Sequence, residues 1–183
     1  MAHIYLGLGS NKGDRLENLR AAIKALPPLV EVKRVSSVYE TVPMASSADL
    51  PVRGTQAGGY GGPQYHETQD FFFNIAVHGH TSLTPFDLFK LAKEIERQVG
   101  RTESFENGPR ELDIDILLFD NLILNTPELT IPHPRMHERP FVLVPLEEIA
   151  RRVEHPVLGR EIIELWDEQD GGRGVVFQTR KIL

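Results

Sequence analysis

The order in which hydrophobic periodicities change along the chain constrains its fold more than any other feature. Apolar residues spaced two apart predict strands, and apolar residues spaced three or four apart predict helices. The periodic segments follow one another as strand, helix, strand, strand, helix and strand, at residues 3–8, 14–26, 30–41, 71–77, 84–100 and 112–119. Thr84 as N-cap, Pro85 in the first turn and Gly100 after the last apolar position delimit the second helix.

This order is the ferredoxin-like βαββαβ pattern. We therefore expect an α+β fold in which helices pack on a mostly antiparallel sheet. A hairpin around residues 120–121, a short helix near 161–168 and a strand near 175–178 should follow the fourth core strand. The length favours a single domain over the whole chain, with a core at about residues 3–150 and a C-terminal extension at 151–183.

Composition excludes several functional classes. The 183 residues include no cysteine, which excludes disulfide frameworks, thiolate zinc sites and cysteine nucleophiles. A net charge of -6 argues against nucleic acid as a partner, because phosphate backbones need a basic surface. No apolar run reaches membrane-spanning length and the first residues lack the pattern of a secretory signal, so no membrane partner and a cytoplasmic location are expected. The oligomeric state stays open.

Two glycine-rich segments invite functional readings. The segment 7–13 has Lys12 where a dinucleotide-binding fingerprint needs its third glycine, and it also lacks the P-loop spacing, so we interpret it as a tight strand-to-helix turn. The segment 45–69 is long and rich in glycine. Such a loop is either a functional lid or disordered segment, or a tolerated surface insertion.

The strongest local signal is the acid pair Asp113 and Asp115. Residues two apart on a strand share a face, so the two carboxylates should lie side by side while Ile114 enters the core. Adjacent carboxylates repel unless a cation lies between them, and Mg²⁺ favours one or two carboxylates together with substrate phosphates. The alternative is a solvated strand face with two ordinary acids.

Three weaker groups accompany this pair. Phe72 and Asn74 share one strand face and offer a stacking surface and a hydrogen-bonding edge, although these two residues alone favour a packed Phe and a turn-capping Asn over a binding role. Residues 132–139 place cationic side chains on a proline-rich path that could hold phosphates or form a charged surface turn. His78 and His80 are expected to be solvated, because nothing nearby in the sequence completes a metal site.

Together these motifs resemble the 6-hydroxymethyl-7,8-dihydropterin pyrophosphokinase family over about residues 4–150. The resemblance rests on five blocks in the same order, at residues 6–11, 36–44, 70–74, 108–117 and 131–141. Two of them, Gly-Pro-Arg-x-x-Asp-x-Asp and the Pro-His block, are specific to the family. It implies transfer of pyrophosphate from the co-substrate ATP to a reduced pterin in folate synthesis, with release of AMP and with two Mg²⁺ ions.

The resemblance also assigns roles to individual residues. It implies catalytic roles for Arg101, Arg110, Asp113 and Asp115, the two acids being the metal ligands. The implied pterin contacts are Thr41, Val42, Pro43, Met44, Phe72, Asn74 and Phe141. The implied nucleotide contacts are Glu96, Arg101, Arg110, Ile116, Thr130, His133 and Arg139.

The chain departs from the family pattern at residues 102–107, where an acidic segment replaces the usual arginines and tryptophan. In the longer loop at 45–69, Arg53 could replace a missing cation. Two alternatives share the acid pair or the fold: a metal-dependent phosphohydrolase and a non-catalytic ferredoxin-like ligand-binding module.

Overall fold

The computed structural model describes residues 1–41, 71–100, 110–169, 175–179 and 182. The main sheet has six strands: β1 (Ala2–Ser10), β2 (Val30–Val35), β3 (Val38–Thr41), β4 (Phe72–Thr81), β5 (Asp113–Phe119) and β10 (Val175–Thr179). Their order is β10-β3-β4-β1-β5, with β2 also paired to β4, and every pair within this sheet is antiparallel. The predicted ferredoxin-like arrangement is confirmed.

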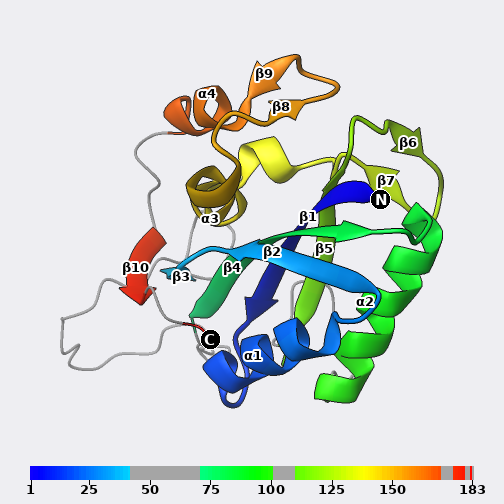
Figure 1. Ribbon diagram of the computed structural model, residues 1–183. Helices are drawn as coiled ribbons and strands as arrows, with labels where there is room; N and C mark the ends of the chain where they lie inside the picture. Colours follow the sequence, from blue (N-terminus) through cyan, green and yellow to red (C-terminus); the bar gives the residue numbers. More distant parts are fainter. Residues whose placement is uncertain (42–70, 101–109, 170–174, 180–181, 183) are drawn as a thin grey trace, which may run out of the picture.

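Helices cover both faces of this sheet (Figure 1). The helices α1 (Arg15–Ala25) and α2 (Pro85–Val99) lie side by side against one face. On the other face, α3 (Pro140–Ala150) contacts β4 and carries α4 (Ile162–Asp167) against it. Each face therefore has its own hydrophobic core. Within the described ranges, none of these helices has the length and hydrophobicity of a membrane span.

The predicted helix boundaries are confirmed by their caps. The Asp14 side chain accepts a hydrogen bond from the Glu17 N–H, which satisfies a free donor at the start of α1. Thr84 does the same for Asp87 at the start of α2, and Gly100 ends that helix with a φ of 106°. A left-handed backbone of this kind favours glycine, which explains its position after the last turn.

The segment predicted as one strand at 30–41 forms two. Ser36 interrupts it, because its side-chain hydroxyl rather than a backbone carbonyl accepts the Ala76 N–H at 2.9 Å. Ser37 then turns its own N–H to the Glu148 carboxylate on α3. The expected turn at residues 7–13 also differs, because β1 continues through Gly7 and Gly9 to Ser10.

The part after β5 was predicted only partly. The strands β6 (Leu124–Asn125) and β7 (Thr130–Ile131) form a hairpin that turns at 126–129, not at 120–121, where a tight turn instead ends β5. A 3-10 turn at Met136–Glu138 and the helix α3 were not foreseen. The short pair β8 (Glu154–His155) and β9 (Arg160–Glu161) precedes α4, which with β10 matches expectation. The segments 45–69 and 102–107 lie outside the described residues.

Candidate active site

The acid pair lies near the start of β5, as predicted. Ile114 is buried in the core while Asp113 and Asp115 keep 27% and 36% of their side chains exposed on the opposite face. Arg110 Nη1 lies 2.8 Å from Asp113 Oδ2, and His133 Nε2 lies 3.9 Å from Asp115 Oδ2. The two carboxylates thus occupy a partly enclosed surface with a cationic or hydrogen-bonding group beside each.

The electrostatics of the pair favour a cation. Burial first and the neighbouring Asp113 carboxylate second raise the pKa of Asp115 to about 6, against the opposing effect of Lys93 and Arg139. A carboxylate with a raised pKa holds its negative charge at a cost, and a hard divalent ion between the two acids removes that cost. Two adjacent carboxylate donors of this kind fit Mg²⁺.

His133 faces the pair as a neutral group. Burial, together with Arg139 and Arg135, lowers its pKa to about 4. Its Nδ1 accepts a hydrogen bond from the Arg135 N–H at 3.3 Å, which leaves the proton of the neutral ring on Nε2. The nitrogen nearest Asp115 is therefore a hydrogen-bond donor, able to serve a carboxylate or a phosphate oxygen.

A glycine separates the acid pair from the Asn74 side of the sheet. Gly9 of β1 pairs with Asn74 of β4 on one side and with Asp113 of β5 on the other. Two strand spacings place the backbones of Asn74 and Asp113 roughly 10 Å apart. Gly9 presents no side chain there, and a methyl group on it would lie 3.0 Å from Asn74 Oδ1 and 3.7 Å from Phe72 Cδ1. The glycine keeps the surface between the two groups open.

Asn74 is held in a fixed orientation. It is 6% exposed, and its Nδ2 donates to Thr41 Oγ1 on β3 at 2.8 Å. One donor is thereby satisfied, and Oδ1 is oriented toward Gly9. Phe72, two residues before Asn74, shares its face of β4 and is only partly buried. An aromatic ring and an amide edge therefore meet at one end of the sheet.

A cavity of about 220 Å³ opens beside Asp115. Its walls combine β5, the β6–β7 hairpin and helix α2, and they include four residues that the sequence assigned to the site: Asp115, Ile116, Thr130 and His133. The remaining walls are Phe89, Ile114, Thr126, Pro127, Glu128, Leu129 and Pro134. The structure brings these distant segments together around one cavity, whose lining combines apolar side chains with polar ones, the Asp115 carboxylate among them.

Two groups that hold the site together were not assigned these roles from the sequence. Asn11 Oδ1 accepts the Arg110 N–H at 2.8 Å, and the Asn11 N–H donates to the Arg110 carbonyl at 3.2 Å. Asn18 Nδ2 of α1 donates to the Glu111 carbonyl at 3.0 Å. Asn11 and Asn18 therefore fix the backbone segment that presents Arg110. In the sequence, these two amide side chains after Gly9 were the only indication of that role.

Glu96 was assigned to the nucleotide side and is 1% exposed. Its Oε1 accepts the Ile114 N–H at 2.8 Å and the Lys93 ammonium at 2.7 Å. Because Ile114 stands between the two acids, these bonds fix the strand segment that carries the pair. This geometry favours a positioning role for Glu96.

Comparison with known proteins decides the family. The model of the 7,8-dihydro-6-hydroxymethylpterin-pyrophosphokinase (HPPK) family matches residues 5–151. The chain belongs to the HPPK family. A 2-amino-4-hydroxy-6-hydroxymethyldihydropteridine pyrophosphokinase from Bacillus subtilis is 41% identical over 173 residues, which cover 91% of this chain and 92% of that protein. Its counterpart from Aquifex aeolicus is 38% identical over 168 residues, with 92% of each chain covered.

Longer proteins also contain a related region. A folic acid synthesis protein of Dictyostelium discoideum is 41% identical over 155 residues, which span 85% of this chain and 20% of that protein. The crystal structure of Plasmodium falciparum HPPK-DHPS wild type has a TM-score of 0.67 at 16% identity and covers 91% of this chain and 44% of its own, which confirms the fold. HPPK membership makes the chain an ATP-dependent pyrophosphokinase, and no comparison favours the phosphohydrolase or the non-catalytic module.

The remaining residues assigned by resemblance to HPPK separate into two groups. Arg139 and Phe141 lie together at the start of α3, with the Arg139 guanidinium carbon 5.6 Å from the centre of the Phe141 ring. Burial lowers the pKa of Arg139, as does the neighbouring Arg135, and the two acids oppose this shift. The other group, Arg101, Val42, Pro43 and Met44, lies outside the described residues.

Proposed function

We propose that this HPPK transfers the terminal pyrophosphate of ATP to the hydroxymethyl group of 6-hydroxymethyl-7,8-dihydropterin. The pterin hydroxyl oxygen forms a bond to the β-phosphorus, the bond from that phosphorus to the α–β bridging oxygen breaks, and AMP leaves. The hydroxyl proton passes to solvent. The observation that carries this proposal is the row Asn74, Gly9 and Asp113, which sets an aromatic-amide edge beside an acid pair across one glycine.

The pterin is assigned to the Asn74 side. Asn74 can hydrogen-bond the polar edge of a heterocycle, and its bond to Thr41 fixes which way its amide faces. Phe72 and Phe141, both partly buried, supply aromatic surfaces for the two faces of the ring. The backbone around Thr41, continuing into Val42, Pro43 and Met44, completes this proposed set.

The nucleotide is assigned to the cavity beside Asp115. Its apolar walls suit a base, and Ile116 and Thr130 offer the backbone and hydroxyl groups that would orient it. His133 stands where the cavity reaches the acid pair, which is the natural place for the phosphates. Arg139 and Arg110 supply positive charge there, and Arg101 is proposed to join them.

Asp113 and Asp115 would hold Mg²⁺, and we propose two ions as in the resemblance. Bound Mg²⁺ would neutralise triphosphate charge and lower the pKa of the attacking hydroxyl. The chain's own contribution is positioning: Glu96 fixes the β5 backbone between the acids, and Asn11 fixes the segment that carries Arg110. Because phosphoryl transfer needs alignment more than covalent chemistry, such rigid placement is a large part of catalysis.

Product analysis tests the proposal. Purified protein with Mg²⁺, ATP and the hydroxymethyl-dihydropterin should release AMP and form a pterin that carries both transferred phosphates. Without the pterin, ATP should remain intact. Release of ADP or inorganic phosphate, or equal ATP consumption without pterin, would instead support a phosphohydrolase. A single domain, a cytoplasmic location and the lack of nucleic-acid or membrane partners stay predictions from the sequence.

A further inference from the structure

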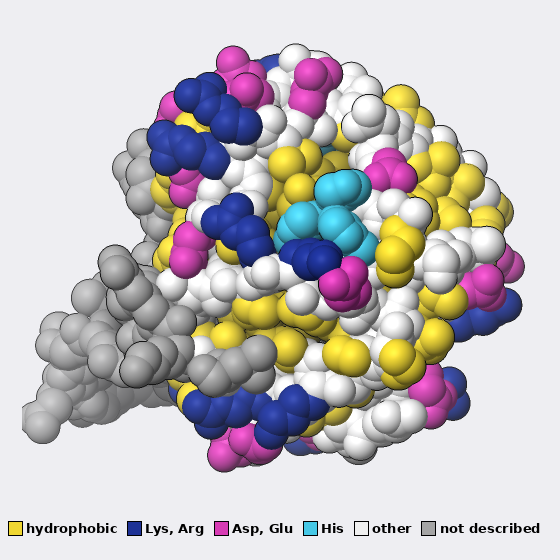
Figure 2. All heavy atoms as spheres, viewed as in Figure 1, with side chains coloured by type: hydrophobic (Ala, Val, Ile, Leu, Met, Phe, Trp, Pro, Cys, Tyr) yellow, Lys and Arg dark blue, Asp and Glu magenta, His cyan; other side chains and the backbone are white. Residues whose placement is uncertain are grey.

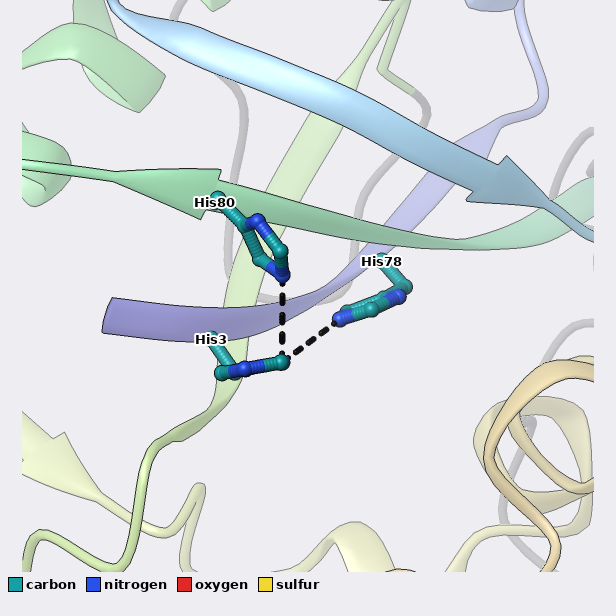
Figure 3. A group of neighbouring side chains, drawn as sticks. All are labelled: His3, His78 and His80. Atoms are coloured by element: carbon teal, nitrogen blue, oxygen red, sulfur yellow. Dashed lines mark hydrogen bonds between the residues drawn. The ribbon is translucent and has the colours of Figure 1, made fainter. Parts of the chain in front are cut away.

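Three histidines meet at the other end of the same sheet face. His3 of β1 pairs with His80 of β4, and His78 lies two residues earlier on the same face of β4. Figure 3 shows the three imidazole rings directed toward one another from these two strands. The expectation that nothing near His78 and His80 completes a metal site was therefore wrong. The residue that the sequence analysis missed is His3, because it lies far from His78 and His80 in the sequence and is brought beside them only by the pairing of β1 with β4. We call these residues the histidine cluster.

The ring nitrogens of the cluster converge. His3 Nδ1 lies 3.2 Å from His78 Nε2 and 3.2 Å from His80 Nε2, and one donor atom from each residue lies within 4.8 Å of the others. Bonds of about 2.0–2.1 Å to a tetrahedral Zn²⁺ ion would separate two nitrogens by roughly 3.3–3.4 Å. Two of the three separations already match this value, and a small rotation of His78 or His80 would close the third.

Hydrogen bonds alone do not account for this arrangement. A neutral imidazole nitrogen either carries its proton or accepts one along a single direction in the ring plane. His3 Nδ1 can therefore make a good hydrogen bond to His78 or to His80, and not to both together. A metal ion accepts all three lone pairs at once. We propose that the histidine cluster binds a divalent transition-metal ion of the zinc class, distinct from the Mg²⁺ of the active site.

The surroundings of His78 suit this role. Burial lowers the pKa of His78, and the charges of His3, His80, Arg34 and Lys33 lower it further. The neutral ring is the form that binds metals. The rings are also held in place, since His78 stacks on Tyr5 with ring centres 4.7 Å apart. Such packing reduces the freedom that the donors lose when they bind an ion.

The surrounding charges do not block an ion. Arg34 directs its guanidinium to the carbonyls of Ile149 and Glu148 at the end of α3, and Lys33 pairs with Glu31. Glu31 is also the register partner of His80 and brings a carboxylate to the same side. Figure 2 shows histidine side chains gathered at the surface with basic and acidic side chains beside them, so an ion can reach the cluster from solvent.

The donor atoms indicate which metals the histidine cluster would bind and distinguish it from the Mg²⁺ site at the acid pair. Imidazole nitrogens suit Zn²⁺, Co²⁺, Ni²⁺ or Cu²⁺, whereas Mg²⁺ prefers oxygen donors. Three histidines leave at least one coordination position for water. The six residue-to-residue steps from Gly9 to His3 separate the two places by roughly 20 Å along β1. An ion here would join β1 to β4 without contact with the acid pair.

Zinc titration of the metal-free protein tests the proposal. The protein carries no histidine tag, and excess Mg²⁺ is present to occupy the acid pair. Calorimetry should show one Zn²⁺ per chain, and His80→Gln should weaken this binding at least about tenfold, as should His3→Gln. The matched controls His137→Gln, a histidine outside the cluster, and Asp115→Asn, in the active site, should leave Zn²⁺ binding unchanged.

A second readout keeps the test independent of folding. Co²⁺ should give the visible absorption of a nitrogen-liganded ion in the wild type, and this absorption should disappear in His80→Gln while the circular dichroism stays the same. Three results would overturn the proposal: no Zn²⁺ binding in the wild type, equal binding in His80→Gln, or loss of the Zn²⁺ site in Asp115→Asn instead.

Discussion

The substitution Gly9→Ala tests the arrangement of the proposed pterin side most sharply. Gly9 separates Asn74 from Asp113 in the sheet, and its backbone is not in a left-handed conformation. Alanine there is therefore free of backbone strain, but its methyl group would lie 3.0 Å from Asn74 Oδ1. Because this distance is shorter than an ordinary contact, the amide must move by a few tenths of an ångström.

The size of the effect follows from the bond that this movement disturbs. Asn74 Nδ2 donates to Thr41 Oγ1 at 2.8 Å in a buried position, and a displaced amide loses its alignment with Thr41 and with the pterin edge. An unsatisfied buried polar group costs about 1–3 kcal/mol, which corresponds to roughly 5- to 150-fold in the pterin dissociation constant. The nucleotide dissociation constant should change little, because no nucleotide-side atom lies among those nearest the methyl group.

Gly7→Ala is the matched control. It lies on the same strand and face, but its methyl group would meet only the Leu117 side chain, at 3.4 Å or more. Calorimetric titration of both variants with pterin and with a non-hydrolysable ATP analogue makes the comparison, and urea unfolding confirms that both fold. Equal pterin affinities in the two variants would refute the reasoning, as would equal weakening of pterin and nucleotide in Gly9→Ala.

Three further predictions follow from the same geometry. Asp113→Ala and Asp115→Ala should each nearly abolish AMP release, while the Mg²⁺-free variants unfold at the same or a slightly higher temperature because the two acids repel each other. Ile114→Ala in the core should instead lower the free energy of unfolding by about 2–5 kcal/mol, and a similar loss in the acid variants would contradict the assignment. Because the pKa of Asp115 is raised to about 6, the contribution of this carboxyl group to the free energy of unfolding is present at low pH and is lost as pH rises through about 6. Because the pKa of His133 is lowered to about 4, the contribution of this imidazole has the opposite sign and increases as pH rises from about 4 to its usual value of 6.5. Urea unfolding at a series of pH values should therefore show a steeper rise for Asp115→Asn and a shallower one for His133→Gln, and parallel profiles would count against both shifts. The Glu148 carboxylate accepts three hydrogen bonds that tie the β2–β3 junction to α3, so Glu148→Gln should lower the free energy of unfolding by about 1–3 kcal/mol and raise the pterin KM. An unchanged KM would show that this junction does not position the site.

Local periodicity was sufficient to predict the core of the fold. The helix caps at Asp14 and Thr84 and the alternation of apolar residues in β1, β4 and β5 each involve residues only a few positions apart, so they can be recognised in the sequence alone. The helix α3 was missed because it contains Pro145 and is apolar on nearly every side, which removes the helical period. The break at Ser36 was missed because it depends on a hydroxyl that replaces a backbone acceptor from another strand.

The site was predictable to the same extent. The acid pair needs only the two-residue repeat of a strand, which is why Asp113 and Asp115 could be placed on one surface. The link from Asn11 to Arg110 joins residues 99 positions apart, and the pairing of His3 with His80 joins residues 77 apart. Such contacts depend on sheet register, which one sequence does not reveal. The resemblance to a family gave the expected roles of the site residues, and the strand pairing in the structure showed which of these residues lie next to one another.

Paramagnetic relaxation tests the central claim most directly, namely that the acid pair and the pterin edge meet across Gly9. Mn²⁺ replaces Mg²⁺ in the presence of the hydroxymethyl-dihydropterin and a non-hydrolysable ATP analogue. The hydroxymethyl proton signals of the bound pterin should broaden strongly in the wild type. In Asp115→Asn this broadening should disappear while the pterin still binds. Broadening that persists in Asp115→Asn, or an unbroadened signal in the wild type, would contradict the account.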